Sequence, residues 1–228
     1  MSRERYAQQL RELENELLRM GAMVEETIGR SVQALKDQNV ETAREVIRAD
    51  DLVDRAQYAL EEKALLLIAT QQPMARDLRL ISAAISIASE LERMGDYAEG
   101  IAEITIRSAS KPLLKPLVDI PRMATCAQQM LRSSLDAYTR QDVAAARQVG
   151  ASDDEVDELT GKVQRELIGY MVADPSVIEQ ATNLLYVAHN LERIADRATN
   201  IAERVIFMVT GQITDLNKGD ANANPPRL

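Results

Sequence analysis

The chain has 228 residues and a formal net charge of −9, with no cluster of Lys and Arg, which argues against a nucleic-acid-binding protein. Its single cysteine, Cys126, excludes an internal disulfide, and its apolar runs are too short to cross a bilayer. Aromatic residues make up only 3% of the chain, whereas Ala, Leu, Glu, Arg and Gln are abundant, so the composition favours an all-helical protein.

Three long helices are predicted in the first half of the chain. Residues 4–37 carry apolar side chains at steps of three and four, as an amphipathic helix requires. A second helix is expected over residues 40–70, with Asn39 as its N-cap. Pro73 ends that helix and suits an early position of a third helix, which extends to about residue 107. The apolar positions of the first helix are Leu10, Leu13, Leu17, Met20, Val24, Ile28 and Leu35.

The same pattern restarts in the second half. A loop rich in Ser and Pro covers residues 108–121, and helices are expected over about 121–140, 143–172 and 176–210. Asp174 is predicted to cap the last helix, and Pro175 to occupy its first turn. Short connections between consecutive helices make neighbours antiparallel, so each half is predicted to be an up-down bundle.

An internal repeat connects the two halves. The segment 91–103, Leu-Glu-Arg-Met-Gly-Asp-Tyr-Ala-Glu-Gly-Ile-Ala-Glu, returns at 191–203 with eight of thirteen residues identical. A shift of 103 residues likewise pairs Asp50 with Asp153 and the sequence around them. We therefore expect an all-α fold of two pseudo-symmetric three-helix bundles, encoded by a repeat of about a hundred residues. The expected domains are residues 1–110, residues 111–212 and a disordered tail at 213–228.

Pairs of acids spaced four residues apart occur in the second and third helix of each repeat. Asp54 and Glu92 each lie 19 residues from Pro73, and Asp50 and Asp96 each lie 23 residues from it. Residues equidistant from the turn of a helical hairpin lie at the same height, so these carboxylates should face each other. The second repeat has the same symmetry about its turn. The predicted groups are Asp50, Asp54, Glu92 and Asp96 in the first repeat, and Asp153, Asp157, Glu192 and Asp196 in the second.

Facing carboxylates indicate a metal site. Two like charges about 4 Å apart repel by roughly 4 kcal/mol at an effective dielectric of 20, and a hard cation relieves that repulsion. Asp50, Asp54, Asp153 and Asp157 have no Lys or Arg three or four residues away. All-carboxylate ligation suits Mg, Mn, Ca or Fe. His189 is a candidate additional ligand, although a single His on a helix is more often simply part of the surface.

A solvated acidic face is the alternative interpretation of these acids. Arg93 and Arg193 lie three residues before Asp96 and Asp196 and can pair with them along the helix. Such pairing explains the third and sixth helices better than the second and fifth. A structural bundle of the spectrin kind does not predict acids matched across the hairpin in both repeats.

The two Leu-Glu-Arg-x-x-Asp-x-Ala-x-x-Ile-Ala-Glu segments resemble those of the PhoU family, the accessory regulators of the phosphate-specific ABC transporter. The resemblance covers about residues 4–210. It implies two three-helix bundles, a homodimer in the cytoplasm, and binding of a divalent or trivalent metal (Mg, Mn, Fe or Zn) by the eight acids. Gly100 departs from the family pattern, which Asn200 matches, so the periphery of the first site is expected to differ.

The resemblance also implies a regulatory function. Such proteins connect the ATPase subunit of the transporter to the sensor histidine kinase PhoR, keep the phosphate-starvation response off when phosphate is plentiful, and restrain phosphate uptake. The charged N-terminus shows no signal peptide, which agrees with a cytoplasmic location.

The rival function is a carboxylate-bridged, metal-dependent enzyme built in a helical bundle. Di-metal enzymes of that kind use Glu-x-x-His pairs, and this chain has a single His with no acid three residues before it. The sequence also lacks a P-loop and any nucleophile with an adjacent base. We therefore expect no catalytic residues and a binding or scaffolding protein.

Overall fold

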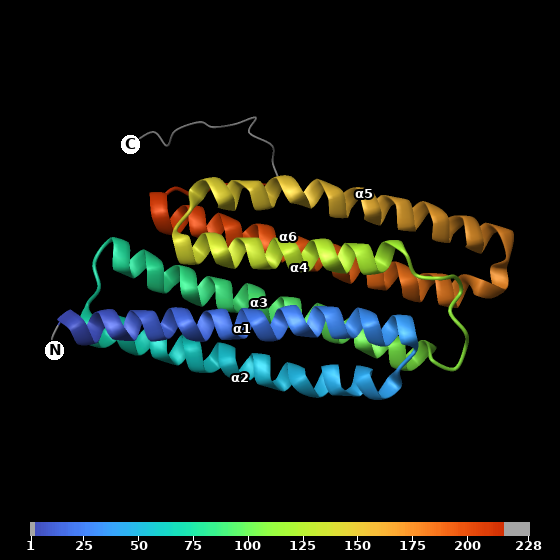
Figure 1. Cartoon of the computed structure of the whole chain (residues 1–228), viewed down its shortest axis with the longest axis horizontal. Coiled ribbons are helices and arrows are strands. Elements are labelled where there is room, and N and C mark those ends of the chain that lie inside the picture. Colours follow the sequence, from blue (N-terminus) through green and yellow to red (C-terminus); the bar gives the residue numbers. More distant parts are fainter. Residues whose placement is uncertain (1–2, 217–228) are drawn as a thin grey trace.

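The structure, a computed structural model, describes residues 3–216, which form long helices and no strand (Figure 1). This confirms the predicted all-α fold of two three-helix bundles. Much of the tail expected to be disordered, residues 217–228, lies outside the described residues. No helix within residues 3–216 is long and apolar enough to span a membrane. The helices are α1 (Arg3–Asp37), α2 (Val40–Gln71), α3 (Arg76–Ser108), α4 (Asp119–Arg140), α5 (Val143–Ala173) and α6 (Ile178–Thr210), with a short 3-10 helix η1 (Pro175–Val177) before α6.

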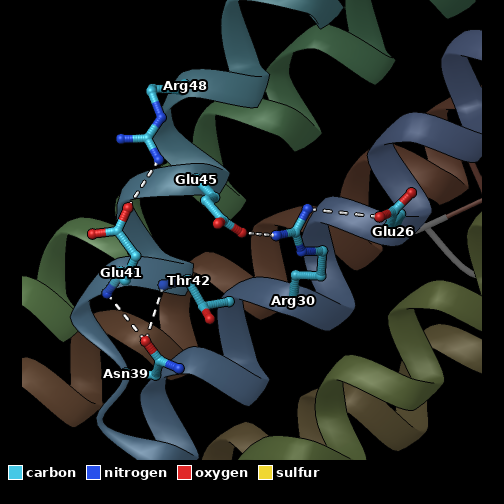
Figure 2. Close-up of polar contacts among 7 residues, drawn as sticks. All are labelled: Glu26, Arg30, Asn39, Glu41, Thr42, Glu45 and Arg48. Atoms are coloured by element: carbon cyan, nitrogen blue, oxygen red, sulfur yellow. Dashed lines mark hydrogen bonds and ion pairs between the residues drawn. The ribbon is translucent and has the colours of Figure 1, made fainter.

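The turns that begin α2 and α5 are copies of one another. Gln38 and Gln141 adopt left-handed backbone conformations, with φ of 50° and 54°, and end the preceding helices. Asn39 then accepts hydrogen bonds from the backbone N–H groups of the second and third residues of α2, at 3.1 and 3.0 Å (Figure 2). Asp142 caps α5 in the same way at 2.9 and 3.0 Å. The caps satisfy amide donors that the helices leave unpaired, so they fix where each helix begins.

One of the ion pairs near this turn joins α1 to α2. Figure 2 shows the Arg30 guanidinium of α1 between Glu26 of the same helix and Glu45 of α2. Arg48 makes a further contact to Glu41 within α2. All of these side chains are substantially exposed, so the pairs contribute little to stability.

The turn between α2 and α3 differs from the prediction. Gln72 ends α2 in a left-handed conformation with φ of 48°, and α3 begins only at Arg76. Pro73 therefore lies in the connection and not in the first turn of α3. At the equivalent turn of the second repeat, Asp174 is a cap as predicted, since its side chain accepts from the Ser176 amide, but it caps η1, which Pro175 opens, and α6 itself begins only at Ile178.

The two bundles lie side by side along their whole length and share one hydrophobic core. α1 packs against α4, and α3 packs against α6, so helices of different repeats are neighbours (Figure 1). Most of the buried apolar side chains of both bundles form one continuous cluster that includes Leu17, Ile87, Leu131 and Leu191, and a small separate cluster joins Ala34, Ala43, Val46 and Ala102. The predicted apolar positions of α1 all contribute to it, Leu10 as a partly buried member.

Gly21 of α1 lies against the side chain of Leu135 in α4. A Cβ atom at Gly21 would lie 2.3 Å from Leu135 Cδ1, far inside a van der Waals contact. The glycine therefore lets the Leu135 side chain pack directly against the α1 backbone, and it sets the separation of the two bundles at that point.

Candidate metal centre

The acids of the first repeat lie beside the buried seam between α2 and α3. Val46 and Val53 of α2 and Leu91 and Met94 of α3 are buried in that seam because they occupy the core-facing positions of their helices. The predicted acids occupy neighbouring positions on the same two helices. The apolar pattern that buries the seam therefore also turns these carboxylates toward one another at its edge.

Three carboxylates meet closely in the first repeat. Asp50, Asp96 and Glu99 each offer an oxygen atom, and these atoms all lie within 4.8 Å of one another. Asp50 is only 8% exposed, Glu99 is half-buried and Asp96 is exposed. The structure thus brings the predicted pair Asp50 and Asp96 together and adds an acid that the predicted set did not contain.

The position of the turn explains why Glu99 joins the group. Since α2 ends at Gln71 and α3 begins at Arg76, Asp50 is level with Tyr97, between Asp96 and Glu99. The sequence does indicate that Glu99 belongs to this group, because Glu99 lies three residues after Asp96 and so continues the acidic stripe of α3.

The electrostatics show how tightly the first group is assembled. Burial raises the pKa of Asp50 to about 7, and the negative charges of Glu99, Asp96, Asp54 and Glu92 add to that shift. All four neighbours named there come from the acidic faces of α2 and α3. The geometry thus brings Asp50 and Asp96 of the predicted set together, whereas Asp54 and Glu92 are near enough for their charges to add to the shift.

The acids of α3 are affected in the same direction. Burial, followed by neighbouring carboxylates, raises the pKa values of Glu92, Asp96 and Glu99. Arg93 partly offsets the shift at Glu92 and Asp96. No ion pair between Arg93 and Asp96 forms among the residues that the structure covers, so the intrahelical pairing considered for the first repeat is not observed.

The second repeat assembles its acids around Asp153. This side chain is 8% exposed, and burial raises its pKa to about 7, with further contributions from Asp196, Asp157, Asp154 and Glu192. Burial and the charges of Asp196 and Asp154 also raise the pKa of Asp157. The acids of the second repeat thus surround Asp153 closely enough to affect its pKa, whereas among the described residues three carboxylates with oxygen atoms within 4.8 Å of one another occur in the first repeat alone. The role of the predicted acids as metal ligands stays a prediction.

Basic groups contact two acids of the second cluster. Arg193 Nη1 lies 3.0 Å from Asp196 Oδ2, which is the intrahelical pair considered from the sequence. His189 Nδ1 lies 3.6 Å from Glu192 Oε2, and the imidazole is about half exposed. His189 is therefore close enough to Glu192 to influence the cluster.

Gly95 places Asp50 against α3. A Cβ atom at Gly95 would lie 2.7 Å from Asp50 Oδ1, so an alanine there would displace the carboxylate. The second repeat has Ala195 at the equivalent position. Glycine inside a helix costs about 1 kcal/mol relative to alanine. A mid-helix glycine within an acidic motif was the sequence signal for this close approach.

The difference between Gly100 and Asn200 affects the junction between the two bundles. Asn200 Nδ2 donates to Glu90 Oε2 at 3.1 Å, across the junction of α6 and α3. On the opposite side of the pseudo-symmetric pair, Asn190 Nδ2 would lie 2.8 Å from a Cβ atom at Gly100. The Gly100–Asn200 difference therefore changes the junction between the bundles and leaves the acids of the first cluster in place.

The donor set fits a hard metal cation. Every candidate ligand in the two clusters is a carboxylate, the type preferred by Mg, Ca, Mn and Fe. Asp50 Oδ1 is buried and has no hydrogen-bond partner, and a buried polar atom ordinarily has one. A cation held by Asp50 and its neighbours would supply the missing interaction and reduce the repulsion between the acids.

The fold and the two clusters define a class of protein: a duplicated three-helix bundle that presents a group of carboxylates on each repeat. A family model described as the PhoU domain matches the chain twice, over residues 17–105 and 120–205. The chain belongs to the PhoU family.

Curated relatives match over nearly the whole chain. A protein of Clostridium acetobutylicum is 39% identical over 218 residues, covering 95% of this chain and 100% of the relative. One of Aquifex aeolicus is 42% identical over 205 residues, covering 90% and 93%. Both carry the name "Phosphate-specific transport system accessory protein PhoU homolog".

Solved structures share the fold. The crystal structure of PhoU from Pseudomonas aeruginosa superposes with a TM-score of 0.86 at 33% identity, covering 91% of this chain and 100% of that one. The structure of the phosphate transport system regulatory protein PhoU from Streptococcus pneumoniae gives 0.85 at 30% identity, with 92% and 99% covered. The family likeness therefore holds in three dimensions as well as in sequence.

Proposed function

We propose that this protein is an accessory protein of the phosphate-specific ABC transporter and a negative regulator of the phosphate-starvation response. In this proposal it acts in the cytoplasm as a homodimer, couples the ATPase subunit of the transporter to the sensor kinase PhoR, and restrains phosphate uptake. The observation that carries the proposal is the match to accessory proteins over 90% or more of the chain, including both repeats.

The arrangement of the residues supports a scaffold over an enzyme. Six long helices packed around one core give a rigid body with acidic side chains on its surface. Within residues 3–216, the only histidine contacts Glu192 and makes no hydrogen bond to a Ser, Thr or Cys side chain. A histidine placed in this way is not arranged to activate a nucleophile.

We further propose that each acidic cluster binds a divalent or trivalent metal ion. The ligands are Asp50, Asp54, Glu92 and Asp96 in the first repeat and Asp153, Asp157, Glu192 and Asp196 in the second. A bound cation supplies positive charge that offsets the repulsion between the facing carboxylates. The protein positions the acids on two rigid helices per repeat, so the sites are held ready before the ion arrives.

A reporter assay tests the regulatory function. In a strain that lacks this gene, we expect an alkaline-phosphatase reporter of the starvation response to be active in high phosphate, and the wild-type gene to restore repression. A deletion strain that still represses the reporter in high phosphate would contradict the proposal.

Titration calorimetry tests metal binding separately. We expect Mn²⁺ to bind the chelator-treated wild-type protein and to bind the Glu192→Ala/Asp196→Ala variant with about half the stoichiometry. Glu158→Ala is a matched control, because Glu158 is an exposed acid of α5 outside the predicted ligand set. Equal and negligible heats in the wild type and the double variant would contradict the proposed metal binding and would not affect the proposed regulatory function.

A further inference from the structure

The two acidic clusters are equivalent in the repeat but not in their surroundings. In the second cluster, Arg193 contacts Asp196 at 3.0 Å and His189 contacts Glu192 at 3.6 Å. Glu203 of the same acidic stripe accepts the Leu216 amide at 2.8 Å. Within residues 3–216, the equivalent acids of the first repeat, Glu92, Asp96 and Glu103, form no ion pair or hydrogen bond. Protein groups thus already occupy part of the second cluster only.

The repeats also differ in the number of acids. Glu99 has an oxygen within 4.8 Å of oxygens of both Asp50 and Asp96. Its equivalent in α6 is Thr199, which is fully buried and cannot supply a charge. At this position of the repeat, the first cluster therefore has a carboxylate that the second lacks.

The unpartnered oxygen at Asp50 is an independent observation at the first cluster. Asp50 is more than nine-tenths buried, and its Oδ1 atom has no hydrogen-bond partner. The absence of a side chain at Gly95 lets that oxygen lie against α3, beside Asp96 and Glu99. Asp153 is equally buried, but among the described residues neither of its oxygens is both fully buried and without a partner. Ala195 replaces the glycine there.

We infer that the first cluster is the tighter of two unequal metal sites, and that Glu99 is a ligand there in addition to the four acids of the paired motifs. The inference rests on the proposed metal binding. A divalent cation entering the first cluster gains an extra carboxylate and displaces no bound protein group. At the second cluster the cation competes with Arg193 for Asp196.

The test is titration of Mn²⁺ into the chelator-treated full-length protein, with the concentration of free Mn²⁺ measured in parallel by electron paramagnetic resonance. We expect two classes of site in the wild type. Glu99→Gln should lower the Mn²⁺ affinity of the tighter class of site at least tenfold and leave the affinity of the weaker class unchanged. The matched control is Glu103→Gln. Glu103 lies one turn along α3 from Glu99 and outside the group of three close oxygen atoms, so this variant removes the same charge from a different position. It should change the affinity of the tighter class of site less than threefold.

Two further variants address the other asymmetries. Gly95→Ala should weaken the tighter class by displacing Asp50, and Arg193→Gln should strengthen the weaker class by freeing Asp196. Thermal unfolding of each chelator-treated variant establishes that it is folded. Two indistinguishable sites in the wild type, or a Glu99→Gln variant that binds as the wild type does, would overturn the inference while leaving metal binding intact. Absence of any Mn²⁺ binding by the wild type would overturn both.

Discussion

Glu90 of α3 and Arg197 of α6 form an ion pair across the junction of the two bundles, with 3.2 Å between Oε2 and Nη1. Their side chains are only 13% and 19% exposed, respectively. Asn200 donates to the same carboxylate oxygen at 3.1 Å. The equivalent of Glu90 in the second repeat is Asn190, so only one of the two pseudo-symmetric positions carries a charge pair.

This ion pair predicts a measurable loss of stability in Glu90→Gln. The variant leaves the Arg197 guanidinium largely buried without a countercharge. Because breaking a fully buried pair costs about 3–5 kcal/mol, we expect a loss of roughly 2 kcal/mol in the free energy of unfolding at this partly buried one. Urea denaturation monitored by circular dichroism measures it. The double variant Glu90→Gln/Arg197→Met should recover part of the loss, and a single variant as stable as the wild type would refute the prediction.

Two glycines predict opposite effects of the same substitution. Gly21→Ala should destabilise the protein by about 1–2 kcal/mol, because overpacking costs of roughly 1–3 kcal/mol exceed the helix propensity gained. The clash is with Leu135 Cδ1, 2.3 Å from the new Cβ position. Gly169→Ala is the matched control, since no atom lies within 4 Å of its Cβ position, and it should stabilise the protein by about 0.5–1 kcal/mol. Equal effects in denaturant titrations would show that packing at Gly21 is not tight.

The acidic clusters predict how stability depends on pH in the metal-free protein. The pKa values of Asp50 and Asp153 are raised to about 7 in the folded state, compared with an ordinary value of about 3.9. Between those values the folded state binds more protons than the unfolded state. The contribution of these groups to stability is therefore present below about pH 4 and is lost as the pH rises toward about 7.

The variant Asp50→Asn/Asp153→Asn isolates that contribution. It should be more stable than the wild type at pH 8 in chelator, and its free energy of unfolding should vary less between pH 4 and pH 7. Denaturant titrations at a series of pH values measure the difference. A wild type and variant with parallel pH profiles would contradict the assignment of these two aspartates.

Metal binding predicts a gain in stability that a chelator reverses. A ligand that binds only the folded state at a hundred times its dissociation constant adds about 2.7 kcal/mol per site. We expect Mn²⁺ to raise the unfolding temperature of the wild type at pH 7.5, and EDTA to lower it again. The Glu192→Ala/Asp196→Ala variant should keep only the gain from the first cluster. A wild-type unfolding temperature that Mn²⁺ leaves unchanged would contradict folded-state metal binding.

The helix boundaries were largely predictable because the chain marks them with local chemistry. Asn39, Asp142 and Asp174 are all capping residues that act within two or three residues of themselves, and the sequence predicts this for Asn39 and Asp174. Pro73 was misplaced because proline fits either a connection or a first helical turn. The left-handed backbone of Gln72, which decides between them, has no sequence signal comparable to a glycine.

The meeting of the carboxylates was predictable because a hairpin fixes heights once its turn is located. Its fine register was not, since the extra non-helical residues between Gln71 and Arg76 move Asp50 toward Glu99. The contacts at the junction between the bundles could not be predicted from the sequence at all. Contacts such as that between Glu90 and Arg197 join residues 107 positions apart, and no local pattern specifies which faces of α3 and α6 meet.

The single core that runs through both bundles has a consequence for how such a chain arises. A single three-helix unit would expose the apolar faces of its first and third helices to solvent. A second copy of the same unit has matching apolar faces and can cover them. Joining two copies in one gene makes that pairing permanent. It also frees each copy to change independently, as the glycine and glutamate of one copy and the alanine and threonine of the other already illustrate.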